Sequence, residues 1–154
     1  MKRKRNICFA CNGGGHFEQL CLATKNISRE KFDTYWVTDS AKHLKNKLTG
    51  SRHYRFANPT GNFLNLLVNC VQSLWVLIKE RPDVIISTGA GVAFPTMWFG
   101  KYLFRSKVIF LCSAANVTKP SKVPYMIYGI SDLFLVQWPE MKEIFPKSIY
   151  IGVL

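Results

Sequence analysis

The glycine-rich segment Asn12–Gly15 constrains the fold of this chain more than any other feature. The apolar run Ile7–Cys11 precedes it and predicts a buried strand, and an apolar pattern with helical spacing resumes at Phe17. Glycines let the backbone approach a ligand closely, and the first amides of a helix point at whatever lies there. The segment therefore predicts a strand–turn–helix unit that binds an anion. Its candidate ligands are Asn12, Gly13, Gly14 and Gly15.

Runs of apolar and β-branched residues alternate with helical patterns along the rest of the chain. The further strands that we expect are Phe32–Thr38, His53–Phe56, Val84–Ser87, Lys107–Leu111, Leu133–Val136 and Ile149–Ile151. The helices that we expect are Ala41–Leu48, the segment after Gly61 to about Lys79, Val92–Phe104 and a short helix from Trp138. Near-continuous apolar strands separated by helices are typical of a parallel sheet covered on both faces. We therefore expect an α/β fold with a doubly wound, Rossmann-like parallel sheet.

The length and composition are those of one folded domain. The chain has 154 residues, of which 48% are hydrophobic and 19% charged, so it is long and apolar enough to bury a core. It contains no internal repeat, low-complexity segment or linker. We expect a single domain over residues 1–154 with a basic tail at residues 1–5, and no signal peptide, because the apolar region and cleavage site of one do not follow the tail.

A second glycine turn follows the strand expected at Val84–Ser87. It runs over Thr88–Gly91, and its candidate site residues are Gly89, Ala90 and Gly91. Ligands of parallel sheets bind beyond the carboxyl ends of the strands, so both turns and Asp39 belong to the edge where a ligand is expected. The second turn either contacts a ligand or only joins its strand closely to the next helix, and the sequence favours neither interpretation.

Charge and amphipathic pattern point to a membrane surface. Lys and Arg number 21 against nine Asp and Glu, and the net charge of +12 favours anionic partners. In the helix expected over Phe63–Ile78 the polar residues form one narrow stripe, and the apolar arc is wider than a helix that covers a sheet needs. This helix is too short and too polar to predict a membrane span. The helix expected at Val92–Phe104 places aromatic residues beside basic ones, as at membrane interfaces.

The alternative is that both are ordinary core helices. Together with the basic tail, however, they predict monotopic association with an anionic membrane surface. The candidate membrane-facing residues are Lys2, Arg3, Lys4, Arg5, Leu67, Leu74, Trp75 and Trp98. Nucleic acid is not an expected partner, because the aromatic residues lie in apolar runs rather than on a basic stacking surface.

The cysteines do not predict a metal or redox site. They are Cys8, Cys11, Cys21, Cys70 and Cys112. Cys8 and Cys11 have C-x-x-C spacing, but within a strand their side chains point to opposite faces. We expect buried, reduced thiols, no metal and no cofactor.

An NAD-type Rossmann domain is the main alternative from the motifs. Gly13-x-Gly15 follows a strand, and Asp39 ends the second strand as a ribose-binding acid does. The third glycine of that fingerprint is replaced by Glu18, which places a carboxylate near the pyrophosphate, and no substrate domain is present. Both observations count against this interpretation.

Three segments resemble a known family. The stretches NGGGHFEQL (12–20), PDVIISTGAGVAFP (82–95) and SDLFLVQWPEM (131–141) are similar to bacterial exopolysaccharide and capsule glycosyltransferase subunits. These subunits resemble the membrane-anchoring subunit of the eukaryotic UDP-N-acetylglucosamine transferase that extends dolichol-pyrophosphate-linked GlcNAc. The two glycine turns more distantly resemble those of the peptidoglycan lipid II transferase. The likeness covers nearly the whole chain in order.

The resemblance implies the N-terminal, acceptor-side half of a split GT-B glycosyltransferase, peripheral to the cytoplasmic face of the cell membrane. A separately encoded partner supplies the C-terminal half and most contacts to the UDP-sugar. The acceptor is a sugar on a polyprenyl pyrophosphate, whose diphosphate the first glycine turn binds. The alternative within the family is a non-catalytic scaffold that recruits the catalytic subunit to the membrane.

Sugar transfer with inversion requires a base that takes the proton of the acceptor hydroxyl. His16, at the mouth of the first turn, is the first candidate because its unperturbed pKa lies near working pH, and Glu18 and Asp39 are alternatives. His16 equally fits a residue that only hydrogen-bonds the loop or the acceptor phosphate. The chain departs from the family where Cys112 replaces an acidic residue and Asn116 replaces an arginine, so the role of those positions is in doubt here.

Overall fold

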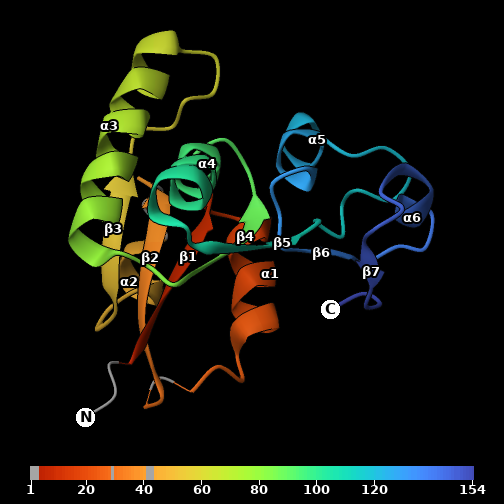
Figure 1. Ribbon diagram of the computed structural model, residues 1–154, viewed down its shortest axis with the longest axis horizontal. Helices are drawn as coiled ribbons and strands as arrows, with labels where there is room; N and C mark the ends of the chain where they lie inside the picture. The colour runs from red at the N-terminus through yellow and green to blue at the C-terminus, as the bar shows by residue number, and fades with distance from the viewer. Residues whose placement is uncertain (1–3, 29, 41–43) are drawn as a thin grey trace.

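A computed structural model describes residues 4–28, 30–40 and 44–154, and within these ranges seven parallel strands form one sheet. The strands are β1 (Arg5–Cys11), β2 (Phe32–Asp39), β3 (Arg52–Phe56), β4 (Val84–Gly89), β5 (Lys107–Leu111), β6 (Leu133–Val136) and β7 (Ile149–Tyr150). The helices are α1 (Gly15–Thr24), α2 (Leu44–Lys47), α3 (Phe63–Glu80), α4 (Ala93–Phe104), α5 (Lys122–Tyr128) and α6 (Met141–Ile144). The spatial order of the strands is β3-β2-β1-β4-β5-β6-β7 (Figure 1).

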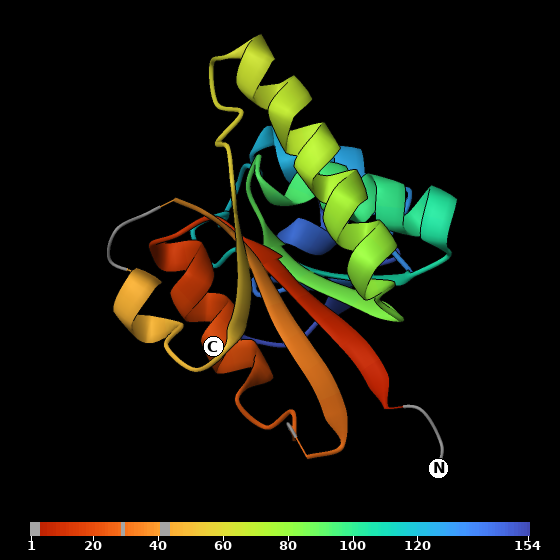
Figure 2. The ribbon, with the colours of Figure 1, turned by 90° about the vertical axis from the view of Figure 1, so that its left-hand side faces the viewer.

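Helices cover both faces of the sheet, as expected for a doubly wound fold (Figure 2). Alternate residues of β1 divide between the faces: Cys8 and Ala10 pack with Val76 of α3 and Met97 of α4, whereas Phe9 packs on the other face. That second face is covered by side chains of α1 and α2. They are Phe17, Leu20 and Leu44. The apolar runs in the sequence thus form strands that are buried on two sides.

The order of the strands changes direction between β1 and β4. β1 pairs in parallel with β2 on one side and with β4 on the other. This is the topological switch point at which doubly wound sheets bind ligands, because the connections leave the two central strands in opposite directions and open a crevice. Both glycine turns follow these two strands.

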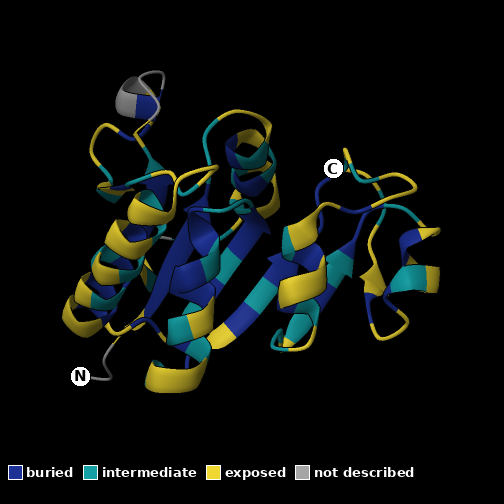
Figure 3. Ribbon diagram, turned by 90° about the horizontal axis from the view of Figure 1, so that it is seen from above, coloured by how far each residue is buried: buried dark blue, intermediate teal, exposed yellow. Residues whose placement is uncertain are grey.

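Helix α3 is oriented with its polar stripe inward. Asn69 and Ser73 are fully buried, and Glu80 is nearly so, although apolar residues outnumber polar ones on this helix. Asn69 Nδ2 donates to the main-chain oxygen of Ala57, and Ser73 Oγ lies 3.0 Å from the hydroxyl of Thr96 on α4. Val76 and Leu77 also pack into the core, but most of the apolar arc faces solvent (Figure 3). Its exposed members are Phe63, Leu64, Leu67, Val68, Val71, Trp75 and Ile78.

The inner end of α3 is held by a network around the Glu80 carboxylate. Tyr54 on β3 donates to Glu80 Oε1 at 2.5 Å, and Asn6 on β1 donates to the main-chain oxygen of Glu80 at 2.7 Å. Arg52 Nη1 forms an ion pair with Glu80 Oε2 at 3.1 Å. A buried carboxylate is stable only when paired and hydrogen-bonded, so these contacts keep α3 against the sheet despite its exposed apolar side.

Most expected elements are confirmed, and the differences are local. The helix predicted at Ala41–Leu48 is described only at Leu44–Lys47, since residues 41–43 lie outside the described ranges. The helix expected from Trp138 begins at Met141, and α5 was not predicted. Pro124 lies in the first turn of α5, where proline is compatible with a helix.

The expected burial of the thiols is confirmed for Cys8, Cys11 and Cys112; Cys21 and Cys70 are half-buried, and no cysteine forms a disulfide.

Gly100 on α4 offers a test of how closely the helix packs on the sheet. A Cβ at this position lies 2.2 Å from Cδ1 of the fully buried Ile85. We expect Gly100→Ala to lower the free energy of unfolding by about 1–2 kcal/mol, because the overpacking penalty exceeds the gain in helix propensity. Urea unfolding followed by circular dichroism measures this change.

Gly129 is the matched control. It follows α5 with φ −69°, and a Cβ there meets nothing within 4 Å. Gly129→Ala should change the free energy of unfolding by less than about 0.5 kcal/mol. Equal stability of the two variants would contradict the close packing of α4 against β4.

Candidate functional site

The two glycine turns lie side by side at the carboxyl edge of the sheet. The first follows β1 and the second follows β4, and Cys11 at the end of β1 pairs with Gly89 at the end of β4 after a register shift. The turns are therefore brought together by pairing of the two central strands, although more than 70 residues separate them in the sequence. The expectation that both turns share this edge is confirmed.

The first turn leaves the start of α1 open. Gly14 has φ +78°, a conformation that glycine adopts without strain, and no side chain caps α1. A Cβ at Gly14 or at Gly15 meets nothing within 4 Å, so there is open space over the turn. The first amides of a helix have no intrahelical acceptor and carry partial positive charge. The arrangement therefore suits an anion that accepts hydrogen bonds from the first turn of α1.

Two of the predicted anion ligands are used inside the protein. The Gly13 amide donates to Asp39 Oδ1 at 3.0 Å, and the Asn12 side-chain oxygen accepts from the amide of Val92 at 3.3 Å. These bonds fix the first turn to β2 and to the start of α4. Asn12 and Gly13 thus hold the turn in shape, which makes the amides of the first turn of α1, from Gly15 onward, the candidate donors to an anion.

His16 is fixed by two hydrogen bonds to the second turn. Its Nδ1 lies 3.0 Å from the main-chain oxygen of Thr88, and the Thr88 hydroxyl donates to the main-chain oxygen of His16 at 2.8 Å. A carbonyl oxygen only accepts, so Nδ1 carries the proton and Nε2 of the neutral ring presents a lone pair. Burial lowers the pKa of His16 below its ordinary value, opposed by the bond to Thr88. The neutral ring therefore dominates at neutral pH.

Glu18 is a weaker candidate for a base than His16. It is exposed in the first turn of α1 and forms an ion pair with Lys47 of α2. The pairing offsets its negative charge beside the open helix start, where a carboxylate alone disfavours an anionic ligand. Asp39, the other alternative, is engaged with the Gly13 amide.

The second turn is strained and closely packed. Gly89 has φ +102°, and Ala90 has φ +80°, which costs a residue with a Cβ about 1 kcal/mol or more. A Cβ at Gly89 lies 3.2 Å from the ring of Phe110, and one at Gly91 lies 3.1 Å from Pro59. A Cβ at either glycine would be in tight contact with its neighbour, which supports the tight-turn interpretation of Gly89, Ala90 and Gly91.

Gln137 and Trp138 hold the loop after β5, a role that sequence reasoning did not find. Gln137 Nε2 donates to the oxygen of Cys112 at 3.0 Å, and Trp138 Nε1 donates to the oxygen of Ala114 at 2.6 Å. The Ala114 amide in turn donates to Gln19 on α1 at 3.3 Å. The loop that contains both departures from the family pattern therefore lies against the first turns of α1.

Most predicted membrane-facing residues are on the surface. Leu67, Trp75 and Trp98 are exposed, whereas Leu74 is half-buried. Lys4 and Arg5 are exposed where β1 begins, and Arg5 belongs to the strand rather than to a tail. Lys2 and Arg3 lie outside the described residues.

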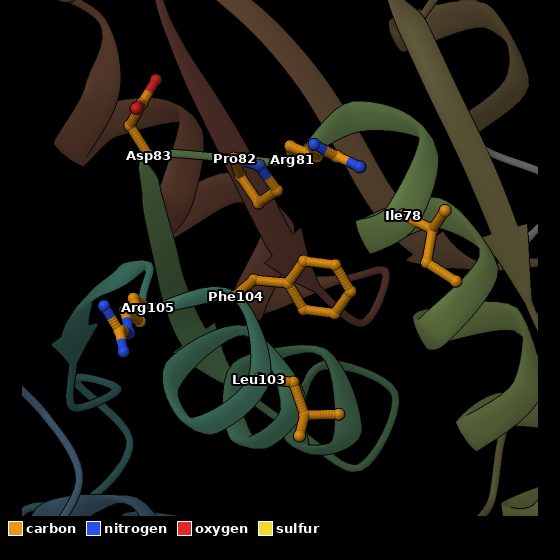
Figure 4. Close-up of a pocket in the computed structure, with 7 residues that line it drawn as sticks. All are labelled: Ile78, Arg81, Pro82, Asp83, Leu103, Phe104 and Arg105. Carbon is orange, nitrogen blue, oxygen red and sulfur yellow. The ribbon is translucent and has the colours of Figure 1, made fainter.

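A pocket of about 510 Å³ lies at the opposite edge of the sheet, between the last turns of α3 and α4. Its lining residues are Ile78, Arg81, Pro82, Asp83, Leu103, Phe104 and Arg105. Figure 4 shows the guanidinium groups of Arg81 and Arg105 pointing away from each other, on either side of Pro82 and Phe104. Polar groups do not converge there, so this pocket lacks the features of a reaction site.

The glycine turns, by contrast, combine an open helix start with a neutral imidazole. Within residues 4–28, 30–40 and 44–154, no cluster of three or more His, Cys, Asp or Glu is arranged to hold a metal ion. What the site offers is therefore amide donors for an anion and one ring nitrogen that accepts a proton.

Sequence comparisons agree with this architecture. The chain is 24% identical over 179 residues to the UDP-N-acetylglucosamine transferase subunit ALG14 of Debaryomyces hansenii, with 99% of this chain and 77% of that protein covered. It is 27% identical over 120 residues to the human subunit of the same name, with 72% and 53% covered. It is also 26% identical over 153 residues to the UDP-N-acetylglucosamine–N-acetylmuramyl-(pentapeptide) pyrophosphoryl-undecaprenol N-acetylglucosamine transferase of a Wolbachia from Brugia malayi, with 96% and 43% covered.

Solved structures show the same fold. MurG of Acinetobacter baumannii superposes with a TM-score of 0.72 at 13% identity, with 90% of this chain and 43% of that chain covered. UDP-N-acetylglucosamine 2-epimerase of Rickettsia bellii gives 0.71 at 13% identity, with 94% and 42% covered. The chain thus corresponds to one Rossmann-like half of a GT-B fold and spans less than half the length of these proteins. A family model described as oligosaccharide biosynthesis protein Alg14 like matches residues 16–154, and the chain therefore belongs to the Alg14-like family.

Proposed function

We propose that this chain is the acceptor-side domain of a two-component glycosyltransferase in bacterial exopolysaccharide or capsule biosynthesis. A separately encoded subunit binds the UDP-sugar, and together the two transfer the sugar to an acceptor on a polyprenyl pyrophosphate. Relatives that are named as transferase subunits support a two-component enzyme. The observation that carries the proposal is the open start of α1 beside a histidine whose Nε2 is an acceptor.

The chemistry follows from this geometry. The acceptor diphosphate accepts hydrogen bonds from the first amides of α1, next to Gly14 and Gly15. His16 Nε2 takes the proton of the acceptor hydroxyl as its oxygen bonds to the anomeric carbon of the donor sugar. The bond from that carbon to the diphosphate of the UDP-sugar breaks at the same time, and UDP leaves with the bonding electrons. No group other than the two substrates and the histidine is needed to balance the step.

Helix α3 supports attachment to the cytoplasmic face of the cell membrane. It is 18 residues long with a mean hydropathy of 1.2, enough by length and composition to cross a membrane, and 22% of it is buried. Its polar stripe, however, is hydrogen-bonded into the fold through Asn69 and Ser73, and these bonds would be lost in a spanning helix. We infer that α3 lies along the bilayer surface with its apolar arc in the lipid.

Neighbouring residues extend this apolar surface. Trp98, Tyr102 and Leu103 of α4 are exposed. The Lys79 ammonium lies 5.0 Å from the ring centre of Trp75, which places a cation beside an aromatic residue as at lipid headgroups. The net charge of +12 adds attraction to anionic lipid.

His16→Asn tests the catalytic role without removing the bond that holds the turn. The Asn Nδ2 donates to the Thr88 oxygen as His Nδ1 does, but it provides no base. With the UDP-sugar-binding subunit co-expressed, we expect turnover to fall by at least about 100-fold while the unfolding midpoint stays within error of wild type. Transfer from radiolabelled UDP-N-acetylglucosamine into extractable lipid measures turnover.

Near-normal turnover of His16→Asn would favour the non-catalytic scaffold. The same assay on Glu18→Gln separates the remaining alternative, because a loss confined to that variant would make Glu18 the base.

The pH dependence provides a second test of His16. A base acts in its neutral form, so protonation inactivates it as the pH falls through its pKa in the free enzyme. Burial lowers the pKa of His16, so the acid limb of kcat/KM should lie below the ordinary histidine value of 6.5. An acid limb above that value would contradict the assignment of this group.

The exposed arc of α3 is tested by replacing Leu67, Val71 and Trp75 together with Gln. These side chains are 47%, 67% and 56% exposed, so the fold should keep its stability. Flotation with vesicles of phosphatidylglycerol and phosphatidylcholine should weaken at least about tenfold, because apolar area no longer enters the lipid.

Leu22→Gln is the matched control, since Leu22 is 48% exposed on α1, which covers the other face of the sheet. It should float as wild type does. Unchanged flotation of the triple variant would assign the α3 arc to a protein partner instead.

A further inference from the structure

Thr88 is the residue that joins the two glycine turns most directly. It lies in β4 directly before Gly89, the last residue of the strand, and is 1% exposed. Its main-chain oxygen lies 3.0 Å from His16 Nδ1, and its hydroxyl donates to the main-chain oxygen of His16 at 2.8 Å. Thr88 therefore contacts both the ring and the backbone of one residue, 72 positions away in the sequence.

The two bonds restrict different motions of His16, one of its ring and one of its backbone. The bond to Nδ1 selects one tautomer and fixes the rotation of the ring. The bond to the main-chain oxygen fixes the backbone from which the ring projects, in the first turn of α1. The two bonds depend on each other. The hydroxyl bond holds the backbone of His16 next to Thr88, and only in that position can the imidazole reach the Thr88 oxygen.

The surroundings keep Thr88 in place. Ser87 Oγ accepts the amide of Gly89 at 2.9 Å, directly after Thr88. Phe110 on β5 packs against the next residue, with its ring 3.2 Å from the position of a Cβ at Gly89. The same hypothetical Cβ lies 3.9 Å from Cε1 of His16, so the second turn also limits movement of the imidazole.

We propose that Thr88 is a positioning residue for the reaction: its hydroxyl holds the first turn of α1 so that His16 keeps a protonated Nδ1 and presents Nε2 to the acceptor. This inference rests on the proposed function of His16 as the base. It assigns the second glycine turn a role in the reaction that does not require contact with either substrate.

The decisive variant is Thr88→Val, which keeps the shape of the side chain and removes only its hydroxyl. Thr38→Val is a matched control, because the Thr38 hydroxyl is also buried near the carboxyl end of a strand, β2, but has no hydrogen-bond partner. Thr88→Ser keeps the hydroxyl and serves as the rescue. All are assayed as the full chain with the UDP-sugar-binding subunit, and all are labelled with ¹⁵N-histidine.

We expect Thr88→Val to lower kcat by about tenfold with little change in KM, since the loss is one of alignment rather than of binding. Thr88→Ser should recover most of the activity, and Thr38→Val should match wild type. In the wild-type protein the ¹⁵N shifts of His16 should show a protonated Nδ1 above its pKa. In Thr88→Val they should move toward the average of the two tautomers.

The spectra separate this inference from the proposed function. A protonated Nε2 in wild type, or unchanged shifts and kcat in Thr88→Val, would overturn it. If Thr88→Val fails to fold, two measurements still test the inference. The wild-type shifts show which ring nitrogen of His16 carries the proton, and the kinetics of Thr88→Ser show whether a hydroxyl at this position is enough for activity. If His16→Asn keeps turnover while Thr88→Val moves the shifts, the proposed base is wrong, and so is the catalytic part of this inference.

Discussion

The pairing of β1 with β4 is the constraint on which the site depends. Parallel pairing brings the ends of these strands together, so that the turns after Cys11 and after Gly89 meet at the switch point of the sheet. Four hydrogen bonds then join the first turn to its surroundings, two of them between His16 and Thr88. The strand order thus creates the crevice, and side chains at its floor fix the shape of the loop.

Residues around the first turn have two different roles: some support its shape, and others leave space for a ligand. Asn12 and Asp39 lie beside the glycine turns and are polar, but both bond to main-chain amides of the protein. The open part of the site is the start of α1, where Gly14 and Gly15 leave space for a ligand. A polar residue near a glycine turn is therefore as often a support for the turn as a ligand.

Much of the fold was predictable because the strands are continuous apolar runs and the turns contain glycine, and both signals are local. Strand β1, the first turn and α1 follow from residues 7–22 alone. The contacts that define the site are not local: His16 reaches Thr88, and Trp138 reaches Ala114. Thr88 carries no signal in the sequence beyond its place in a glycine turn. Periodicity gives the width of the apolar arc of α3 but not the rotation of the helix about its axis, so the half-buried position of Leu74 could not be predicted.

In most surface helices the apolar residues pack against the core and hold the helix in place, and the polar residues on the outside contribute little to stability. Helix α3 partly exchanges these roles. Asn69, Ser73 and Glu80 hold it through hydrogen bonds, together with the buried Val76 and Leu77, whereas most of its other apolar residues face outward. Substitutions among the outward residues then change what the protein adheres to without changing how well it folds. The outward residues can therefore differ with little effect on the fold, whereas the buried amide and hydroxyl groups beneath them cannot lose their hydrogen-bond partners without a cost in stability.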